Sequence, residues 1–156
     1  MSKLGHHPNI IKFVGICFLP EFPKLPAMIM EKVPYGNLHN YLKKQGPANS
    51  MELSRKRHIL LGVANGLHYL HYECEMAVVH MDLKASIVLL NESYDAKISG
   101  FRKACMVSDK ELASNNRYDP DYMPPEVISH AKTTRCTPTI DIFSFGVLAL
   151  FTLNQV

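Results

Sequence analysis

The stretch His80–Leu90 reads His-Met-Asp-Leu-Lys-Ala-Ser-Ile-Val-Leu-Leu and is followed by Gly100-Phe101-Arg102. Short apolar runs on both sides flank a polar loop that holds one carboxylate, Asp82, and one ammonium, Lys84. A loop between two short strands is a place where a fold can hold a carboxylate against a substrate hydroxyl. The stretch therefore predicts a site for chemistry on a hydroxyl group, built around these two side chains.

Composition bounds the class of protein. A chain of 156 residues suits one domain with its own core, and 47% apolar with 20% charged residues is ordinary for a soluble globular protein. The net charge of +3, with both signs interspersed, is too small to indicate nucleic-acid binding, and the basic triplet 55–57 is most simply the exposed start of a helix. The N-terminal residues 1–9 do not resemble a signal peptide, and the apolar run 142–153 is too short to span a bilayer. We expect a cytoplasmic protein without a membrane segment.

The cysteines support the same location. They are widely spaced, with no C-x-x-C pair, at Cys17, Cys74, Cys105 and Cys136. This spacing favours reduced thiols over a disulfide framework or a zinc site.

Apolar periodicity and turn residues predict an α+β chain. The second strand is expected to be covered on both faces because its apolar run is nearly continuous, and the best helical signal has apolar residues at spacings of three and four. The expected elements are strands at 10–18 and 27–30, helices at 38–44 and 52–72, strands at 77–79, 87–90 and 96–99, a long surface loop at 102–121, a short helix from Pro124, and a final helix opened by Asp141.

Six further blocks occur in a characteristic order. They are His7–Lys12, Met28–Val33, Tyr35–Leu42, Ala64–His71, Tyr122–Glu126 and Asp141–Val147, with His80–Leu90 between the fourth and the fifth. Together they resemble the protein kinase domain, in wording closest to the tyrosine-kinase-like group. The resemblance implies a protein-kinase-like fold that is partial: 1–33 as a remnant of the N-lobe and hinge, and 34–156 as the C-lobe through helix F.

The resemblance implies a role for each matching residue. Asp82 would accept or orient the proton of a substrate hydroxyl, and Lys84 would neutralise the transferring phosphoryl group. The implied adenine hinge is weak and consists of Met30 as gatekeeper, the backbone of Glu31 and Val33, and Leu89 beneath the ring. The implied structural residues are His80, Phe101 and Phe13, stacked as a spine between the lobes, Glu126, and Asp141, which would anchor the catalytic loop from below.

The magnesium ligands that the family requires are missing. The asparagine position is Ile87 and the aspartate position is Gly100, so neither supplies a side-chain oxygen. Losing one preorganised charge-stabilising group commonly costs about 10²–10³ in rate, so two losses would cost on the order of 10⁴ or more. We therefore expect no magnesium site and weak or no ATP binding.

Other departures agree with this expectation. Met81 replaces an arginine that would pair with a phosphorylated activation loop. Arg102 replaces a glycine that permits backbone movement, and Asp119 adds a negative charge where a serine/threonine kinase usually has a threonine. The chain also begins where helix C would end and stops inside helix F, so we expect a fragment in which apolar side chains of the last helix, such as Phe145, Leu148 and Phe151, are incompletely covered.

Three functions are compatible with the sequence. The first is a catalytically impaired pseudokinase segment that acts as a binding or regulatory module for protein partners. The second is an active serine/threonine or dual-specificity kinase whose full-length form uses atypical metal ligation. The third is a generic α+β interaction domain outside the family.

Overall fold

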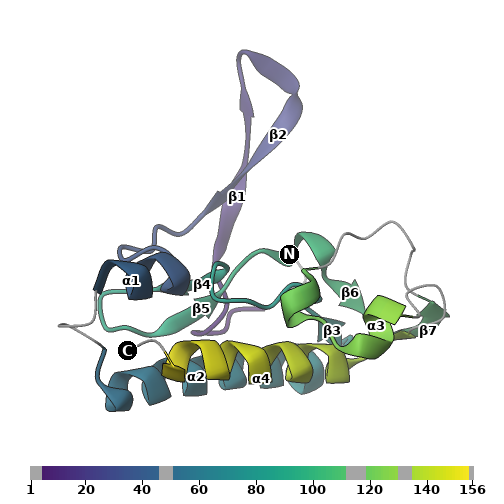
Figure 1. Cartoon of the computed structure of the whole chain (residues 1–156). Coiled ribbons are helices and arrows are strands. Elements are labelled where there is room, and N and C mark those ends of the chain that lie inside the picture. The colour runs from purple at the N-terminus through teal and green to yellow at the C-terminus, as the bar shows by residue number, and fades with distance from the viewer. Residues whose placement is uncertain (1–4, 46–50, 112–118, 130–134, 155–156) are drawn as a thin grey trace.

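The computed structural model describes residues 5–45, 51–111, 119–129 and 135–154, which form a long hairpin above a mainly helical body (Figure 1). The elements in chain order are β1 (Phe13–Leu19), β2 (Phe22–Met30), α1 (Leu38–Gln45), α2 (Leu53–His68), a π-helical turn (Tyr69–Glu73), β3 (Val78–Val79), β4 (Val88–Leu90), β5 (Ala96–Ile98), a 3-10 turn (Phe101–Lys103), β6 (Cys105–Met106), β7 (Ser108–Glu111), a second 3-10 turn (Pro120–Tyr122), α3 (Pro125–Ser129), β8 (Arg135–Cys136) and α4 (Pro138–Asn154).

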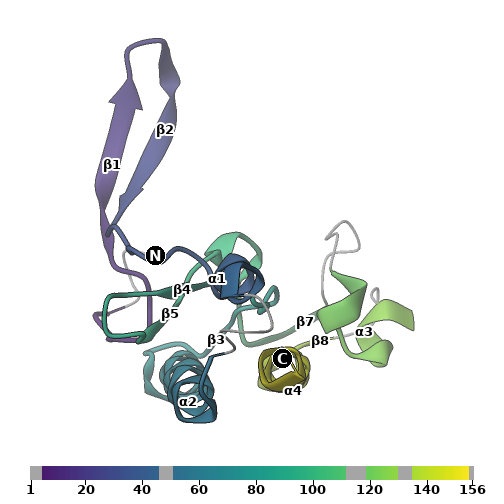
Figure 2. The ribbon, with the colours of Figure 1, turned by 60° about the vertical axis from the view of Figure 1, so that its left-hand side comes forward.

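The hairpin of β1 and β2 stands out from the rest of the molecule in both views (Figures 1 and 2). The two strands are antiparallel, with Phe13 opposite Met30. Its apolar side chains that are between 43% and 65% exposed are Val14, Ile16, Phe18, Met28 and Ile29. The prediction that the second strand is covered on both faces is therefore wrong, because the neighbouring residues Met28 and Ile29, whose side chains point to opposite faces, are both exposed.

The body is built around α2 and α4, which lie side by side below the small β4–β5 ladder (Figure 2). The predicted helix at 52–72 is confirmed, with its last turn wound as a π-helix. Its residues Ile59, Val63 and Leu67 are buried at the predicted spacing. Close packing favours glycine at residue 66, since a Cβ there would lie 2.9 Å from Cδ1 of Ile98 and 3.0 Å from the backbone oxygen of Asn9.

The final helix, α4, begins earlier than predicted, at Pro138, so Asp141 lies inside its first turn and does not cap it. Leu148 is fully buried in the main core, which corrects the expectation that it is poorly covered. Phe145 and Phe151 are partly buried against the same core. The apolar residues that this helix exposes are Ile142, Phe143, Leu150 and Leu153.

The segment predicted as a long loop at 102–121 contains regular structure. β6 pairs with β3, placing Cys105 opposite Val79, and β7 pairs with β8. Residues 112–118 of that predicted loop lie outside the described residues. The short helix expected from Pro124 is confirmed as α3.

A disulfide joins Cys105 in β6 to Cys136 in β8. The prediction of four reduced thiols is wrong for these two residues, and Cys17 and Cys74 are free. Sequence spacing could not identify the pair, because the fold brings together cysteines that are 31 residues apart. Within the described ranges, every helix is too short or too polar to cross a membrane.

Candidate functional site

A buried carboxylate from α4 holds the loop that begins at His80. The backbone N–H groups of His80 and Met81 donate to the two oxygens of Asp141, at 2.7 and 2.9 Å. Nε2 of His71, from the π-helical turn, lies 2.9 Å from the same carboxylate. Three separate segments of the chain therefore meet at one side chain, and this fixes the start of the loop.

His80 is buried and tied to its surroundings on both ring nitrogens. Nε2 lies 2.7 Å from the carbonyl oxygen of Ser99, and Nδ1 accepts from the N–H of Asp82 at 3.3 Å. Burial lowers the pKa of His80, and the nearby Asp141 charge only partly opposes this. The imidazole is therefore held neutral, with its proton on Nε2.

The three proposed spine residues are only partly brought together. The ring of Phe101 meets His80 edge-on, with 4.9 Å between the ring centroids. Phe13 lies in β1 opposite Met30, and among the described residues no ring contact joins it to the other two.

Met81 faces away from the site. Its side chain is fully buried in a second apolar cluster, which also contains Met123, Cys136 and Ile140. Its backbone is left-handed, with φ of 66°. The place of the expected arginine is thus taken by an apolar side chain that offers nothing to a phosphate group.

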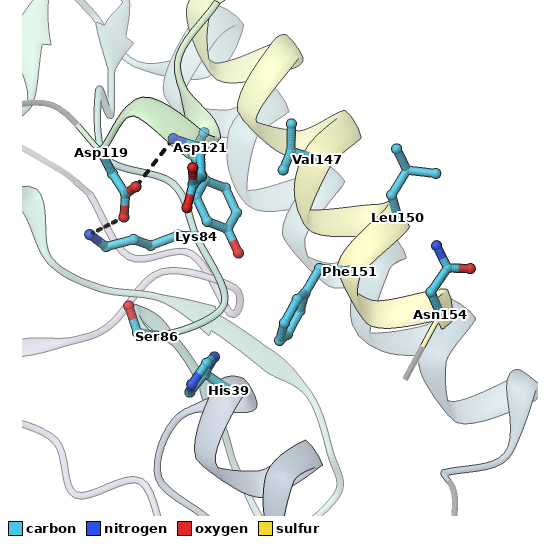
Figure 3. Close-up of a pocket in the computed structure, with 10 residues that line it drawn as sticks. His39, Lys84, Ser86, Asp119, Asp121, Val147, Leu150, Phe151 and Asn154 are labelled. Carbon is cyan, nitrogen blue, oxygen red and sulfur yellow. Dashed lines mark hydrogen bonds and ion pairs between the residues drawn. The ribbon is translucent and has the colours of Figure 1, made fainter. Parts of the chain in front are cut away.

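The two predicted catalytic side chains do lie together. Lys84 Nζ is 3.5 Å from Asp82 Oδ1. It also lies 3.2 Å from Asp119 Oδ2 (Figure 3). Burial alone would lower the pKa of Lys84, but the hydrogen bond to Asp119 and the charge of Asp82 outweigh it and raise that pKa. Asp119, noted in the sequence only as an added charge, is therefore a direct partner of the site lysine.

Sequence reasoning missed Lys103. This residue ends the 3-10 turn after Gly100, and its Nζ donates to Asp82 Oδ1 at 3.0 Å. The Asp82 carboxylate thus lies between two ammonium groups. Its side chain is 15% exposed, so the pairing is shielded from much of the solvent. The sequence shows only that a lysine directly follows Gly100-Phe101-Arg102, and this does not indicate which carboxylate it meets.

The two substituted metal-ligand positions contact each other. Gly100 has a left-handed backbone, with φ of 79°, and a Cβ placed on it would lie 3.1 Å from Cγ2 of Ile87. Ser99 binds the backbone carbonyl of Ile87 through both its N–H and its hydroxyl. The residues at these two positions do not fit a magnesium ion, because neither supplies a side-chain oxygen and Ile87 crowds the place of any side chain on residue 100. Among the described residues, no group of three or more His, Cys, Asp or Glu side chains could hold a metal ion.

The predicted adenine hinge lies where β2 joins the body. Met30 ends β2, and the Glu31 N–H donates to the Lys12 carbonyl at 3.0 Å. The Val33 carbonyl accepts from Gly36 at 3.3 Å.

The chain that follows the hinge pairs with β4. Tyr35 donates to Leu90, and Asn37 bridges to Leu89. Leu89 is thereby brought next to the hinge. Glu126, the remaining predicted residue, is exposed in the first turn of α3.

A pocket of about 680 Å³ opens beside Lys84, between α1, the loop and α4 (Figure 3). One wall is polar and includes Asp119 and Asp121, and the other is the apolar face of α4. Its lining residues are His39, Lys84, Ser86, Asp119, Asp121, Tyr122, Val147, Leu150, Phe151 and Asn154.

Comparison with known proteins identifies the class to which this fold and site belong. The model of the protein tyrosine and serine/threonine kinase family matches residues 1–154. Among curated Arabidopsis thaliana proteins, the chain is 32% identical to the serine/threonine/tyrosine-protein kinase HT1, over 95% of the chain and 35% of HT1. It is 34% identical to the proline-rich receptor-like protein kinase PERK1, over 93% of the chain and 22% of PERK1. It is also 34% identical to the protein BRASSINOSTEROID INSENSITIVE 1, over 96% of the chain and 12% of that protein.

The chain therefore belongs to the protein kinase family and has a partial protein-kinase-like α+β fold. It spans between 12% and 35% of the length of these relatives. Membership removes the generic interaction domain as an alternative to the kinase fold.

Proposed function

We propose that this chain is part of a pseudokinase that acts as a binding or regulatory module for other proteins. The observation that carries the proposal is the contact between Ile87 and Gly100. Either substitution alone would leave one side-chain oxygen ligand, whereas here both are absent and Ile87 crowds the point where a Cβ on residue 100 would stand. Recovery of a metal site would require both positions to change together.

The surroundings of Asp82 support the same function. A general base must be free to approach the hydroxyl that it deprotonates. Here the carboxylate is already paired with Lys103 at 3.0 Å and lies 3.5 Å from Lys84. The pairing lowers its availability to a substrate.

We propose that the module binds ATP weakly or not at all and does not use magnesium. The Glu31 N–H is bonded to the Lys12 carbonyl, so an adenine edge would meet the Glu31 carbonyl and the Val33 N–H. The phosphates of ATP would meet no metal-ligating side chain at residues 87 and 100, and this limits the affinity that the hinge can provide. We also propose a cytoplasmic location. The free thiols of Cys17 and Cys74 agree with a reducing compartment, in which the Cys105–Cys136 disulfide would form only transiently.

An active serine/threonine or dual-specificity kinase with atypical metal ligation is the second candidate. The retained pair of Asp82 and Lys84, on a loop that Asp141 holds in place, favours it. Residues of the complete protein outside this chain would have to supply the missing oxygen ligands.

A phosphotransfer assay on the protein encoded by the complete transcript separates the two. We expect no transfer of labelled phosphate to generic protein substrates in magnesium or manganese, with Asp82→Asn giving the same background. Transfer that Asp82→Asn abolishes would establish the second candidate. Background that both proteins share identifies a contaminating kinase and leaves the pseudokinase assignment intact.

A thermal-shift titration tests nucleotide binding separately. We expect ATP to raise the melting temperature slightly or not at all, with the same result when magnesium is replaced by a chelator. A large shift that depends on magnesium would contradict the proposal, because it requires a metal site at the position that Ile87 fills.

A further inference from the structure

We propose that Cys105 and Cys136 form a reversible redox clasp that controls how firmly residues 119–129 are held against the loop carrying Asp82. The clasp is independent of the proposed function. It would act in an active kinase and in a pseudokinase alike.

The disulfide joins the two sides of the site's support. Cys105 pairs with Val79 in the β3–β6 ladder, and Val79 directly precedes His80. Cys136 ends β8, just before α4, which supplies Asp141 to the same loop. The covalent bond therefore ties the strand next to the loop to the start of the helix that anchors the loop.

The chain between the two cysteines contributes to the site. Asp119 binds Lys84 at 3.2 Å, and the carbonyl of Tyr122 accepts from the Ser144 hydroxyl at 2.6 Å. Met123 is buried in the apolar cluster that contains Cys136. The disulfide closes a loop of chain that includes these contacts. Closing the loop lowers the conformational entropy that the segment gains when it detaches, and so favours the attached state.

The two cysteines of the disulfide differ in solvent exposure, so an external thiol can reach one sulfur atom more readily than the other. Cys136 is 3% exposed, among Val79, Met81 and Ile140, whereas Cys105 is only partly buried at the edge of this cluster. An external thiolate can therefore approach Cys105 more readily than Cys136.

Glutathione is the reductant that we propose. Its thiolate attacks Sγ of Cys105, forming a mixed disulfide and releasing Cys136 as a thiolate that takes up a proton. A second glutathione attacks the glutathione sulfur of this mixed disulfide, releasing the Cys105 thiol and glutathione disulfide. Two electrons and two protons pass to the protein, and glutathione disulfide reverses the sequence.

Reduction leaves the packing nearly intact but removes the covalent constraint. A protonated cysteine behaves as a small apolar residue, so Cys136 stays in its cluster. β6 is then held to β3 by a two-residue ladder, Val78 opposite Met106 and Val79 opposite Cys105, and by the hydrogen bond from the Val107 N–H to the Ala77 carbonyl. Asp119 is expected to leave Lys84 more often in the reduced form.

The first measurement asks whether the pair is reversible. The full chain is equilibrated in buffers of varying ratio of glutathione to glutathione disulfide, quenched with an alkylating reagent and analysed by peptide mass spectrometry. We expect one two-electron transition, in which Cys105 and Cys136 gain alkyl groups together, while Cys17 and Cys74 are alkylated at every ratio. Absence of a Cys105–Cys136 cross-linked peptide at all ratios would overturn the proposal.

The second measurement asks what the bond restrains. Hydrogen exchange of peptides covering β6 and residues 119–129 is compared in oxidised and reduced protein. We expect exchange to be at least about tenfold slower in the oxidised form, well within what a loop of this length allows. Cys17→Ser/Cys74→Ser is the matched control and should keep the response.

Cys105→Ser/Cys136→Ser should exchange like the reduced form under both conditions. If that variant does not fold, Cys105→Ser alone serves, because it retains the buried Cys136 and cannot form the bond. Two results would overturn the proposal. One is a redox-dependent change in hydrogen exchange that persists in a variant without Cys105, and the other is equal hydrogen exchange in the oxidised and reduced wild-type chain.

Discussion

Cγ2 of Ile87 lies 3.1 Å from the point where a Cβ on residue 100 would stand, so the residue at one expected magnesium-ligand position crowds any side chain at the other. This relationship joins two substitutions that look independent in the sequence. An aspartate at residue 100 would be crowded while the isoleucine remains and would need a left-handed backbone.

Gly100→Ala tests this contact. We expect it to lower the free energy of unfolding by roughly 1–2 kcal/mol for the left-handed backbone, with a further loss for the crowding. Gly36→Ala is the matched control, because Gly36 has a similar φ of 66° and open space at its Cβ. In the Ile87→Ala background, Gly100→Ala should cost about as much as Gly36→Ala. Denaturant unfolding of the wild type and the four variants, Ile87→Ala included, gives these three costs. Equal costs for Gly100→Ala in both backgrounds would rule out the contact.

Removal of the Asp141 carboxylate should be among the most damaging single changes. Asp141→Ala leaves the N–H groups of His80 and Met81 and the ring of His71 without their buried acceptor, so we expect a loss of about 3–5 kcal/mol. Asp141→Asn keeps one acceptor oxygen and should fall between this and the wild type. Asp121→Asn, at an exposed carboxylate, should change stability by less than about 0.5 kcal/mol. Urea denaturation followed by circular dichroism measures each, and a neutral Asp141→Ala would contradict the anchoring role.

The buried imidazole of His80 predicts a pH dependence of stability. Burial lowers its pKa in the folded chain, against the opposing charges of Asp141 and Asp82 and in the same direction as Lys103. The unfolded chain therefore binds a proton below about pH 6.5 while the folded chain does not. Stability from this group is fully present above that pH and is lost as the pH falls.

His80→Phe should flatten that slope by up to about 1.4 kcal/mol per pH unit, although it also loses the bond to Ser99. Unfolding free energies measured from neutral to mildly acidic pH give the slopes. Parallel profiles for the variant and the wild type would assign the pH dependence to other groups.

Loss of an apolar side chain should change the free energy of unfolding little in the hairpin and strongly in the core. Met28 is 63% exposed, so Met28→Ser should leave stability within about 0.5 kcal/mol and raise solubility. Leu148 is fully buried, so Leu148→Ala should cost about 2–5 kcal/mol. Denaturation midpoints and the concentration at which aggregation begins test both. A large stability loss from Met28→Ser would show that this face is covered within the chain.

The spacing of apolar residues and the order of motifs were sufficient to predict the main helix and the family. The spacing of Ile59, Val63 and Leu67 predicted α2, because one helical face must pack on the sheet. The order of the motifs placed Asp82 and Lys84 on one loop and predicted the family, which the family match confirms.

Features that depend on distant parts of the chain could not be predicted in the same way. Cys105 and Cys136 meet only because β6 and β8 fold together, and nothing in their spacing signals a bond. The apolar run of β2 suggested two covered faces, but periodicity cannot report which neighbours a strand has. Lys103 reaches Asp82 only because of the turn after Gly100, whose path is a tertiary property.

The anchoring of the loop by Asp141 separates shape from catalysis. Its hydrogen bonds to His80 and Met81 come from helix α4 and require neither a metal ion nor a nucleotide. A lineage could therefore lose magnesium ligands one after another and still present the same loop surface to its partners. Selection on recognition can then continue after selection on phosphate transfer has ended.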